Sequence, residues 1–590
     1  MSKLLSSLQN ILNTAIKTGI RFPLEIITAI LGTIFAIILN EINYNNPYKN
    51  FYYKALMSSS LCLVLFLSVS LFFLASKKNN LLRFLTSLVL GTLIVLFVFS
   101  FHKYITEVEV MEFFVLNIVL HLLVSFAAFL PKTYNQDEFW EFNKQLFLRI
   151  LTAGFYSTVI YCGLALAILA INKLFNFEFY DHIYLHIFFV IAGIFNTTFF
   201  LSGVPEINTS GITLALNYPK GLKNFVKYVL IPLISLYLVI LICYEIRIVV
   251  TLSLPVGWVS NLVLVFAIIG ILSFLLIHPI ATETSNLWMK TFNRWFYFLL
   301  IPLLGLLFWA ILYRINLYGF THERYYVLLL SIWLAVVVGY FLISKHQKIK
   351  FIPISLCLAG LFSIAGPQSA NSISKNSQLS RFESYLQKAE SKKLTFEQEK
   401  DLSSIVDFIT YNYNAKVLLP YTKNKLNALL KKEKEPSSFL IMETLGFNYF
   451  NKYDASQKDI SQFSFYYSER NVQNIHGYDI TFDIYEGNSL DCNECLKINN
   501  ISYSIEAIKE KYGLNLQINQ DKIPLNLVDF INNNYLLFGD KDGTGKRITQ
   551  VVESPKYSIL IVYLSANGKK EANTIDLNNY QIRVMIKIKN

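Results

Sequence analysis

Charged side chains are scarce in this chain: Asp, Glu, Lys and Arg make up 16% of its 590 residues, against roughly a quarter in soluble domains. This scarcity excludes a soluble enzyme. Cysteine and glycine are also few, at 6 and 24 residues, which excludes a disulfide scaffold and a collagen-like fibre. Because 54% of the residues are hydrophobic, a disordered chain is excluded as well. The composition indicates a polytopic membrane protein with a soluble C-terminal part.

The net charge of +12 lies almost entirely in the apolar part of the chain. The first 365 residues hold 24 Lys and Arg against 14 Asp and Glu, whereas residues 366–590 hold 28 against 26. An excess confined to the membrane part is typical of loop charges that set orientation, and not of a nucleic-acid-binding surface. The expected partner is the lipid bilayer, with no nucleic acid.

Long apolar segments recur through the first 365 residues. A helix that crosses about 30 Å of hydrocarbon needs ~20 mostly apolar residues, and helices satisfy their own backbone hydrogen bonds in lipid. We predict about 11 transmembrane helices: Pro23–Leu39, Ala55–Ala75, Phe84–Phe101, Met111–Leu130, Ile150–Ile171, Ile183–Leu201, Tyr228–Tyr244, Val259–Ile277, Trp295–Leu312, Tyr325–Ile343 and Phe351–Ile364.

Basic residues alternate between the connections of these segments. With the N-terminus inside, the inner connections carry 17 Lys and Arg and the outer ones 7, as the positive-inside rule requires. The last segment is short and contains Pro353, so a re-entrant piece is an alternative; lysines before it and small residues after it favour a crossing. Eleven crossings predict a cytoplasmic N-terminus and a periplasmic C-terminal domain in a bacterial inner membrane.

An ordered series of short motifs carries a family resemblance. They are Arg21-Phe-Pro-Leu, Phe139-Trp-Glu-Phe-Asn143, Leu148-Arg149, Leu230-Ile-Pro-Leu233, Leu254-Pro-Val-Gly-Trp258, His278-Pro279, Tyr313-Arg314-Ile315, Tyr318-Gly-Phe-Thr-His-Glu-Arg-Tyr325, Trp333-Leu334, Gly366-Pro-Gln-Ser-Ala370, Ser377-Gln378 and Arg381. Over roughly residues 20–390 the chain resembles the bacterial integral membrane proteins of the domain-of-unknown-function 4153 family. The resemblance implies a multi-spanning membrane protein, and no reaction, ligand or catalytic residue.

A polar and aromatic cluster stands between the ninth and tenth predicted spans. Arginine can hold a carboxylate or phosphate bidentately, so the cluster is a candidate site for a lipid head group or an anionic solute. The alternative is an interfacial aromatic belt in which the glutamate pairs with a neighbouring arginine. The candidate ligand-binding residues are Arg314, Tyr318, Glu323, Arg324 and Tyr325.

Two further pairs of residues are candidates for a role. Asn117 and His121 lie one turn apart near the middle of the fourth span, where they would serve a proton or solute path or join helices by hydrogen bonds. Cys492 and Cys495 are expected to form a disulfide in an oxidising compartment. With His476 the only tail histidine, no metal site is predicted there.

The chain divides by composition into residues 1–365 (polytopic transmembrane domain), 366–440 (helical neck) and 441–590 (soluble β-rich domain). The fold class is thus an α-helical polytopic membrane protein followed by a soluble α+β domain. No known catalytic or nucleotide-binding motif occurs, so no catalytic residue or cofactor is predicted. We expect a non-enzymatic anchor or interaction protein that presents an exported domain to a cell-envelope partner. The alternative is a transporter or lipid-handling protein; the oligomeric state is open.

Overall fold

A computed structural model describes most of the chain. The described residues are 2–43, 45–76, 78–103, 105–131, 135–177, 179–206, 216–251, 258–280, 287–344, 346–433, 435–451, 462–467, 475–485, 490–510, 513–534, 538, 547–571 and 574–589. They form two compact units, one of residues 1–394 with 401–449 and the other of residues 395–400 with 450–590. The predicted motif Leu254-Pro-Val-Gly-Trp258 lies, up to Gly257, outside the described residues.

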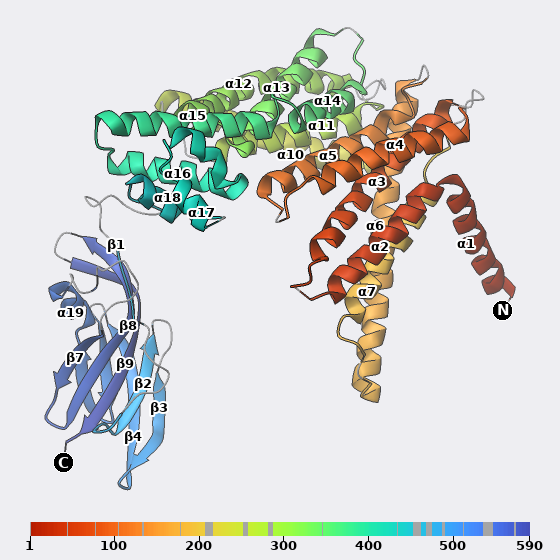
Figure 1. The fold of residues 1–590 in the computed structure, drawn as a ribbon. Helices are drawn as coiled ribbons and strands as arrows, with labels where there is room; N and C mark the ends of the chain where they lie inside the picture. Colours follow the sequence, from red (N-terminus) through yellow and green to blue (C-terminus); the bar gives the residue numbers. More distant parts are fainter. Residues whose placement is uncertain are drawn as a thin grey trace. The chain divides into compact units, whose positions relative to one another are not determined.

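The first unit is helical throughout its described residues (Figure 1). Its membrane part contains α1 (Ser2–Arg21), α2 (Pro23–Glu41), α3 (Lys49–Ser76), α4 (Asn80–Phe99), α5 (Glu107–Ala127), α6 (Gln136–Phe175), α7 (Ile183–Val190), α8 (Asn196–Ser202), α9 (Lys220–Phe225), α10 (Ile231–Thr251), α11 (Trp258–Ile277), α12 (Leu287–Tyr318), α13 (His322–Ile343) and α14 (Phe351–Ile364). Short π-helical stretches join α7 to α8 and α9 to α10.

Nine helices within the described ranges are long and apolar enough to cross a membrane. Two shorter apolar helices, Leu262–Ile277 and Phe351–Ile364, match the eighth and eleventh predicted segments. Every predicted segment overlaps a helix, so the prediction of a polytopic helical membrane part is confirmed. The count of 11 crossings stays a prediction because two of the helices fall short of the usual spanning length.

Two apolar cores hold the membrane helices together. In the first, α3 packs between α2, α4 and α5, and its Leu61 and Leu71 have no exposed surface. In the second, α12 packs against α11 and α13 around the fully buried Phe296 and Leu303. Many apolar side chains on the outer faces remain exposed within the chain, as expected of helices surrounded by lipid.

Four helices follow α14 and form the neck, which belongs to the first unit apart from residues 396–400: α15 (Ala370–Ser391), α16 (Phe396–Asn412), α17 (Asn427–Lys432) and α18 (Ser438–Leu445). The predicted division after residue 440 falls within α18. The neck has its own core, centred on Phe382, Leu402 and Ile441. Ser369 caps the N-terminus of α15: its side chain accepts a hydrogen bond from the Ser372 amide, as is usual for a serine at this position. Its contacts with α13 and α14 join the neck to the membrane helices.

The second unit is built around two antiparallel sheets, as expected for the tail. One sheet has the order β1 (Gln462–Tyr466), β8 (Tyr557–Glu571), β9 (Thr574–Ile588), β2 (Ile480–Tyr485), with β7 (Ile548–Glu553) also paired to β8. The other has the order β3 (Asp491–Ile498), β4 (Ile501–Glu510), β5 (Gly513–Ile518), β6 (Asp521–Leu525). A short helix, α19 (Leu527–Asn533), packs on β9 and β5. Alternating side chains such as Ile484 and Val584 fill the shared core.

Candidate functional site

The connection between α12 and α13 is a three-residue turn that depends on glycine. Gly319 has a φ of 68°, a left-handed conformation that glycine adopts at little cost. A Cβ at this position would stand 2.9 Å from the Ser377 hydroxyl of α15. Thr321 then caps α13 through its side chain. The turn therefore lets α15 approach the backbone at the end of α12.

Polar side chains of α15 bind this turn through its backbone. Ser377 Oγ accepts a hydrogen bond from Phe320 N (2.9 Å). Gln378 Nε2 donates to the carbonyls of Tyr318 (3.0 Å) and Phe320 (2.7 Å). Arg381 also donates to the Tyr318 carbonyl, at 2.7 Å. Because the last carbonyls of a helix lack partners within it, these donors both complete α12 and attach α15 to it.

Arg381 continues this contact into the neck. Its guanidinium pairs with the carboxylate of Asp401 on α16, and Tyr385 donates a hydrogen bond to the same carboxylate at 2.5 Å. Burial, followed by the hydrogen bond and the charge of Asp401, raises the pKa of Tyr385 to about 12. The phenol therefore stays a donor throughout the physiological range. We use the name α15 clamp for Ser377, Gln378, Arg381 and Asp401 together with the backbone of residues 318–320, to which the first three bind.

The structure brings together part of the predicted ligand cluster. Arg324 donates to the carbonyls of Tyr318 (3.1 Å) and Gly319 (2.9 Å), and its guanidinium lies over the Tyr318 ring. Tyr325 is buried and donates to the Gln368 carbonyl at 2.8 Å. These side chains thus support the turn. Binding of an anion or head group at this cluster stays a prediction.

The other two members of that cluster have more freedom. Glu323 is exposed and Arg314 is half-buried. Within the described ranges Arg314 has no hydrogen-bond or ion-pair partner, although it lies close enough to Arg324 for their charges to repel. Together with Arg381, which also repels Arg324, three guanidinium groups gather where α12 ends.

A second polar network, whose residues were not predicted as a site, lies beside the clamp. His322 Nε2 lies 3.0 Å from the Tyr413 hydroxyl, which also donates to the Asn371 carbonyl at 3.2 Å. The Asn371 amide reaches Glu112 of α5 at 3.4 Å. The His322 ring stacks on Phe408. Helices α5, α13 and α15 and the residue that follows α16 therefore share one chain of hydrogen bonds.

This network contains an acid, an imidazole and a phenol, so it can hold or pass a proton. Burial and then the charge of Glu112 raise the pKa of Tyr413 above its ordinary value, so the phenol stays protonated. Two buried oxygens on α15 and α16, Ser374 Oγ and Asn412 Oδ1, have no partner among the described residues. Buried oxygens of this kind are commonly satisfied by ordered water. The only sequence signal for the site was Glu112 itself, a carboxylate at the start of an apolar segment.

The predicted intramembrane pair is arranged differently from this network. His121 Nδ1 lies 2.8 Å from the backbone carbonyl of Asn117, and the imidazole is exposed on the surface of α5. The two residues are therefore in contact through the helix backbone. A role for them in a proton path or between helices stays a prediction.

The motif Phe139-Trp-Glu-Phe-Asn143 lies in the first turns of α6, where its side chains contact neighbouring segments. Trp140 donates its indole N–H to the Leu275 carbonyl at 2.8 Å and stacks on Tyr218. Glu141 and Lys144 form a buried ion pair (2.6 Å) and bind the backbone N–H and C=O of Asn217. A buried pair is stable only when its remaining hydrogen-bonding groups are also satisfied. Here the motif attaches the segment before α9 to α6 and α11.

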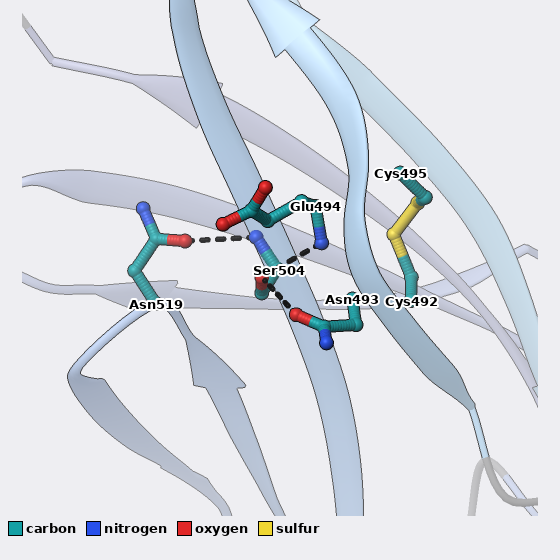
Figure 2. Close-up of a disulfide and its surroundings, with 6 residues drawn as sticks. All are labelled: Cys492, Asn493, Glu494, Cys495, Ser504 and Asn519. Carbon is teal, nitrogen blue, oxygen red and sulfur yellow. Dashed lines mark hydrogen bonds between the residues drawn. A yellow bond between two sulfur atoms is a disulfide. The ribbon is translucent and has the colours of Figure 1, made fainter.

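The tail cysteines lie in a bulge of β3. Cys492 and Cys495 are joined as a disulfide, and the pairing of β3 with β4 shifts register between Cys492 and Leu496. Figure 2 shows how the bulge is held: the Glu494 amide donates to Ser504 Oγ (2.8 Å), and Ser504 N donates to Asn519 Oδ1 (2.8 Å). The disulfide therefore closes a local irregularity of the sheet. Within the described residues, no group of three or more His, Cys, Asp or Glu could hold a metal ion.

The chain combines membrane-length apolar helices with an attached neck and a following strand-rich domain. This architecture defines a polytopic membrane protein with a C-terminal extramembrane part. The sequence model described as Domain of unknown function (DUF4153) matches residues 26–391, from α2 to the end of α15. The chain belongs to this family. No curated protein and no solved structure matches it.

Proposed function

We propose that the protein is a non-enzymatic anchor of the bacterial inner membrane that presents its C-terminal α+β domain to a partner in the cell envelope. In this proposal eleven helices cross the membrane, the N-terminus is cytoplasmic and the C-terminal domain is periplasmic. The excess of Lys and Arg in alternate connections supports this orientation. The Cys492–Cys495 disulfide supports an oxidising compartment.

The observation that carries the proposal is the α15 clamp. Its hydrogen bonds attach the neck to the end of α12 rather than leaving it on a flexible linker. A neck that served only as a flexible tether would require no such attachment, whereas a neck that fixes where the chain leaves the membrane helices does. The clamp residues bind backbone groups of the turn and one another, so their polar groups serve to hold the neck.

Topology is tested first, on the full chain in intact cells. Fusions after residue 394 of a reporter active only in the periplasm and of one fluorescent only in the cytoplasm should give periplasmic activity alone. After mild reduction, a membrane-impermeant maleimide should label Cys492 and Cys495 in spheroplasts. Cytoplasmic fluorescence, or labelling only after lysis, would refute the exported position.

The partner is tested by cross-linking and co-purification. The full chain should capture an envelope protein, and Arg381→Gln should reduce this capture while the protein still accumulates. Arg314→Ala is the matched control, because it removes an arginine without hydrogen-bonded partners in the described structure. If Arg314→Ala accumulates normally but fails to complement a deletion strain, ligand handling at the arginine cluster is favoured over anchoring.

A further inference from the structure

The N-terminal helix α1 has one apolar face that the rest of the chain leaves uncovered. Leu12, Ile16 and Ile20, four residues apart, are 61%, 60% and 76% exposed. Residues at this spacing share one face of a helix. In water, three large apolar side chains on one face would be unfavourable.

A different side of α1 packs against the protein. Thr18 is buried, at 5% exposure, and α1 contacts α8 and α2. Arg21, the last residue of α1, donates to the carbonyls of Val204 (2.8 Å) and Pro205 (3.0 Å) just beyond α8. Figure 1 shows α1 projecting from the helices that it meets at its C-terminal end. The apolar stripe is therefore not a core face of this unit.

The charge of α1 is of one sign. It contains Lys3, Lys17 and Arg21 and no Asp or Glu. It also leads directly into α2, one of the helices long and apolar enough to cross a membrane. A basic amphipathic helix next to a spanning helix has the properties of a helix that lies in the membrane interface and favours anionic lipids.

We propose that α1 is an interfacial helix that inserts Leu12, Ile16 and Ile20 into the leaflet where α2 begins, with its basic residues on anionic head groups. Arg21 positions the end of the helix by its bonds to the chain after α8. This surface is separate from the arginine cluster and from the α15 clamp, and it does not depend on which side of the membrane holds the C-terminal domain.

The test uses full-length protein reconstituted in vesicles, with single cysteines introduced on opposite faces of α1. Ile16→Cys reports the apolar face, and Thr14→Cys is the matched control because that position is also exposed within the chain and lies on the opposite side of the helix. A membrane-impermeant maleimide should label Thr14→Cys about tenfold faster than Ile16→Cys, since only the apolar face is immersed. The unsubstituted protein provides the background, and labelling after detergent addition provides the total.

The vesicle composition identifies the partner. Protection of Ile16→Cys should be present in vesicles of anionic lipid without any other protein, and should weaken in zwitterionic vesicles, at high salt or on adding Lys17→Gln. Equal labelling of the two positions in anionic vesicles would overturn the proposal. So would protection that appears only in native membranes, because α1 would then bind another protein, or protection that scales with protein density, because it would then bind a second copy.

Discussion

Replacing Arg381 by glutamine should loosen the neck from the membrane helices. The guanidinium donates to the Tyr318 carbonyl at 2.7 Å and to the Leu317 carbonyl at 3.3 Å, and it pairs with Asp401. Both members of the pair are largely buried, with side chains 20% and 23% exposed. Glutamine is too short to replace all three contacts, so the Asp401 carboxylate would keep only Tyr385 as a hydrogen-bond partner among the described residues.

The size of the effect follows from the contacts that are lost. Hydrogen bonds that involve a charged group contribute about 1.5–3 kcal/mol each, and these contacts share one side chain and are partly exposed. We therefore expect a loss of about 3 kcal/mol in the free energy of opening α15, which corresponds to roughly 100-fold faster exchange of its amide hydrogens.

Hydrogen exchange read by mass spectrometry on the full chain measures this opening, peptide by peptide. Peptides within residues 370–391 should exchange faster in the variant, whereas peptides of α3 and of β8 should not change. Arg314→Gln serves as the control and should leave all of these peptides unchanged. If α15 exchanges at the same rate in Arg381→Gln as in the unmodified protein, the clamp does not hold the neck.

Three further outcomes are expected. Burial lowers the pKa of His278, so the folded protein binds a proton there less readily than the unfolded chain does. The melting temperature in detergent should therefore fall as the pH drops below about 6.5. His278→Gln should show a smaller fall, and an identical pH profile of the melting temperature in the variant would contradict this prediction. Phe382→Ala, at a fully buried neck position, should lower the free energy of unfolding by about 3–5 kcal/mol and make the neck sensitive to protease. Tyr411→Ala is the control and should have neither effect, because the Tyr411 side chain is 62% exposed. Cys492→Ser removes a disulfide between cysteines three positions apart, which should lower the free energy of unfolding by roughly 2 kcal/mol and speed amide hydrogen exchange in β3. Reduction of the unmodified protein should have the same effect. Unchanged exchange in β3 would refute a stabilising role of the disulfide.

Sequence alone determined where the apolar helices and several of the tail strands lie. Immersion in lipid requires about 20 apolar residues in succession, and burial of one face of a strand requires alternation; both are local properties. In the alternating strands β2 and β9, for example, Ile480 and Ile582 are buried. Likewise, the family resemblance depended on motifs that could be seen in the order of the residues.

Only the tertiary structure decided which of those motifs meet and what their side chains do. Arg381 contacts a carbonyl 63 positions away, and Asn371 reaches Glu112 across 259 positions. Such contacts depend on how each helix is rotated about its axis and on which neighbours it packs against, and spacing along the chain contains neither. For the same reason, residue type alone suggested that Arg324 binds an anion, whereas the structure shows its guanidinium bonded to the backbone of a turn. Glu112 likewise belongs to a network that its spacing along the chain did not reveal.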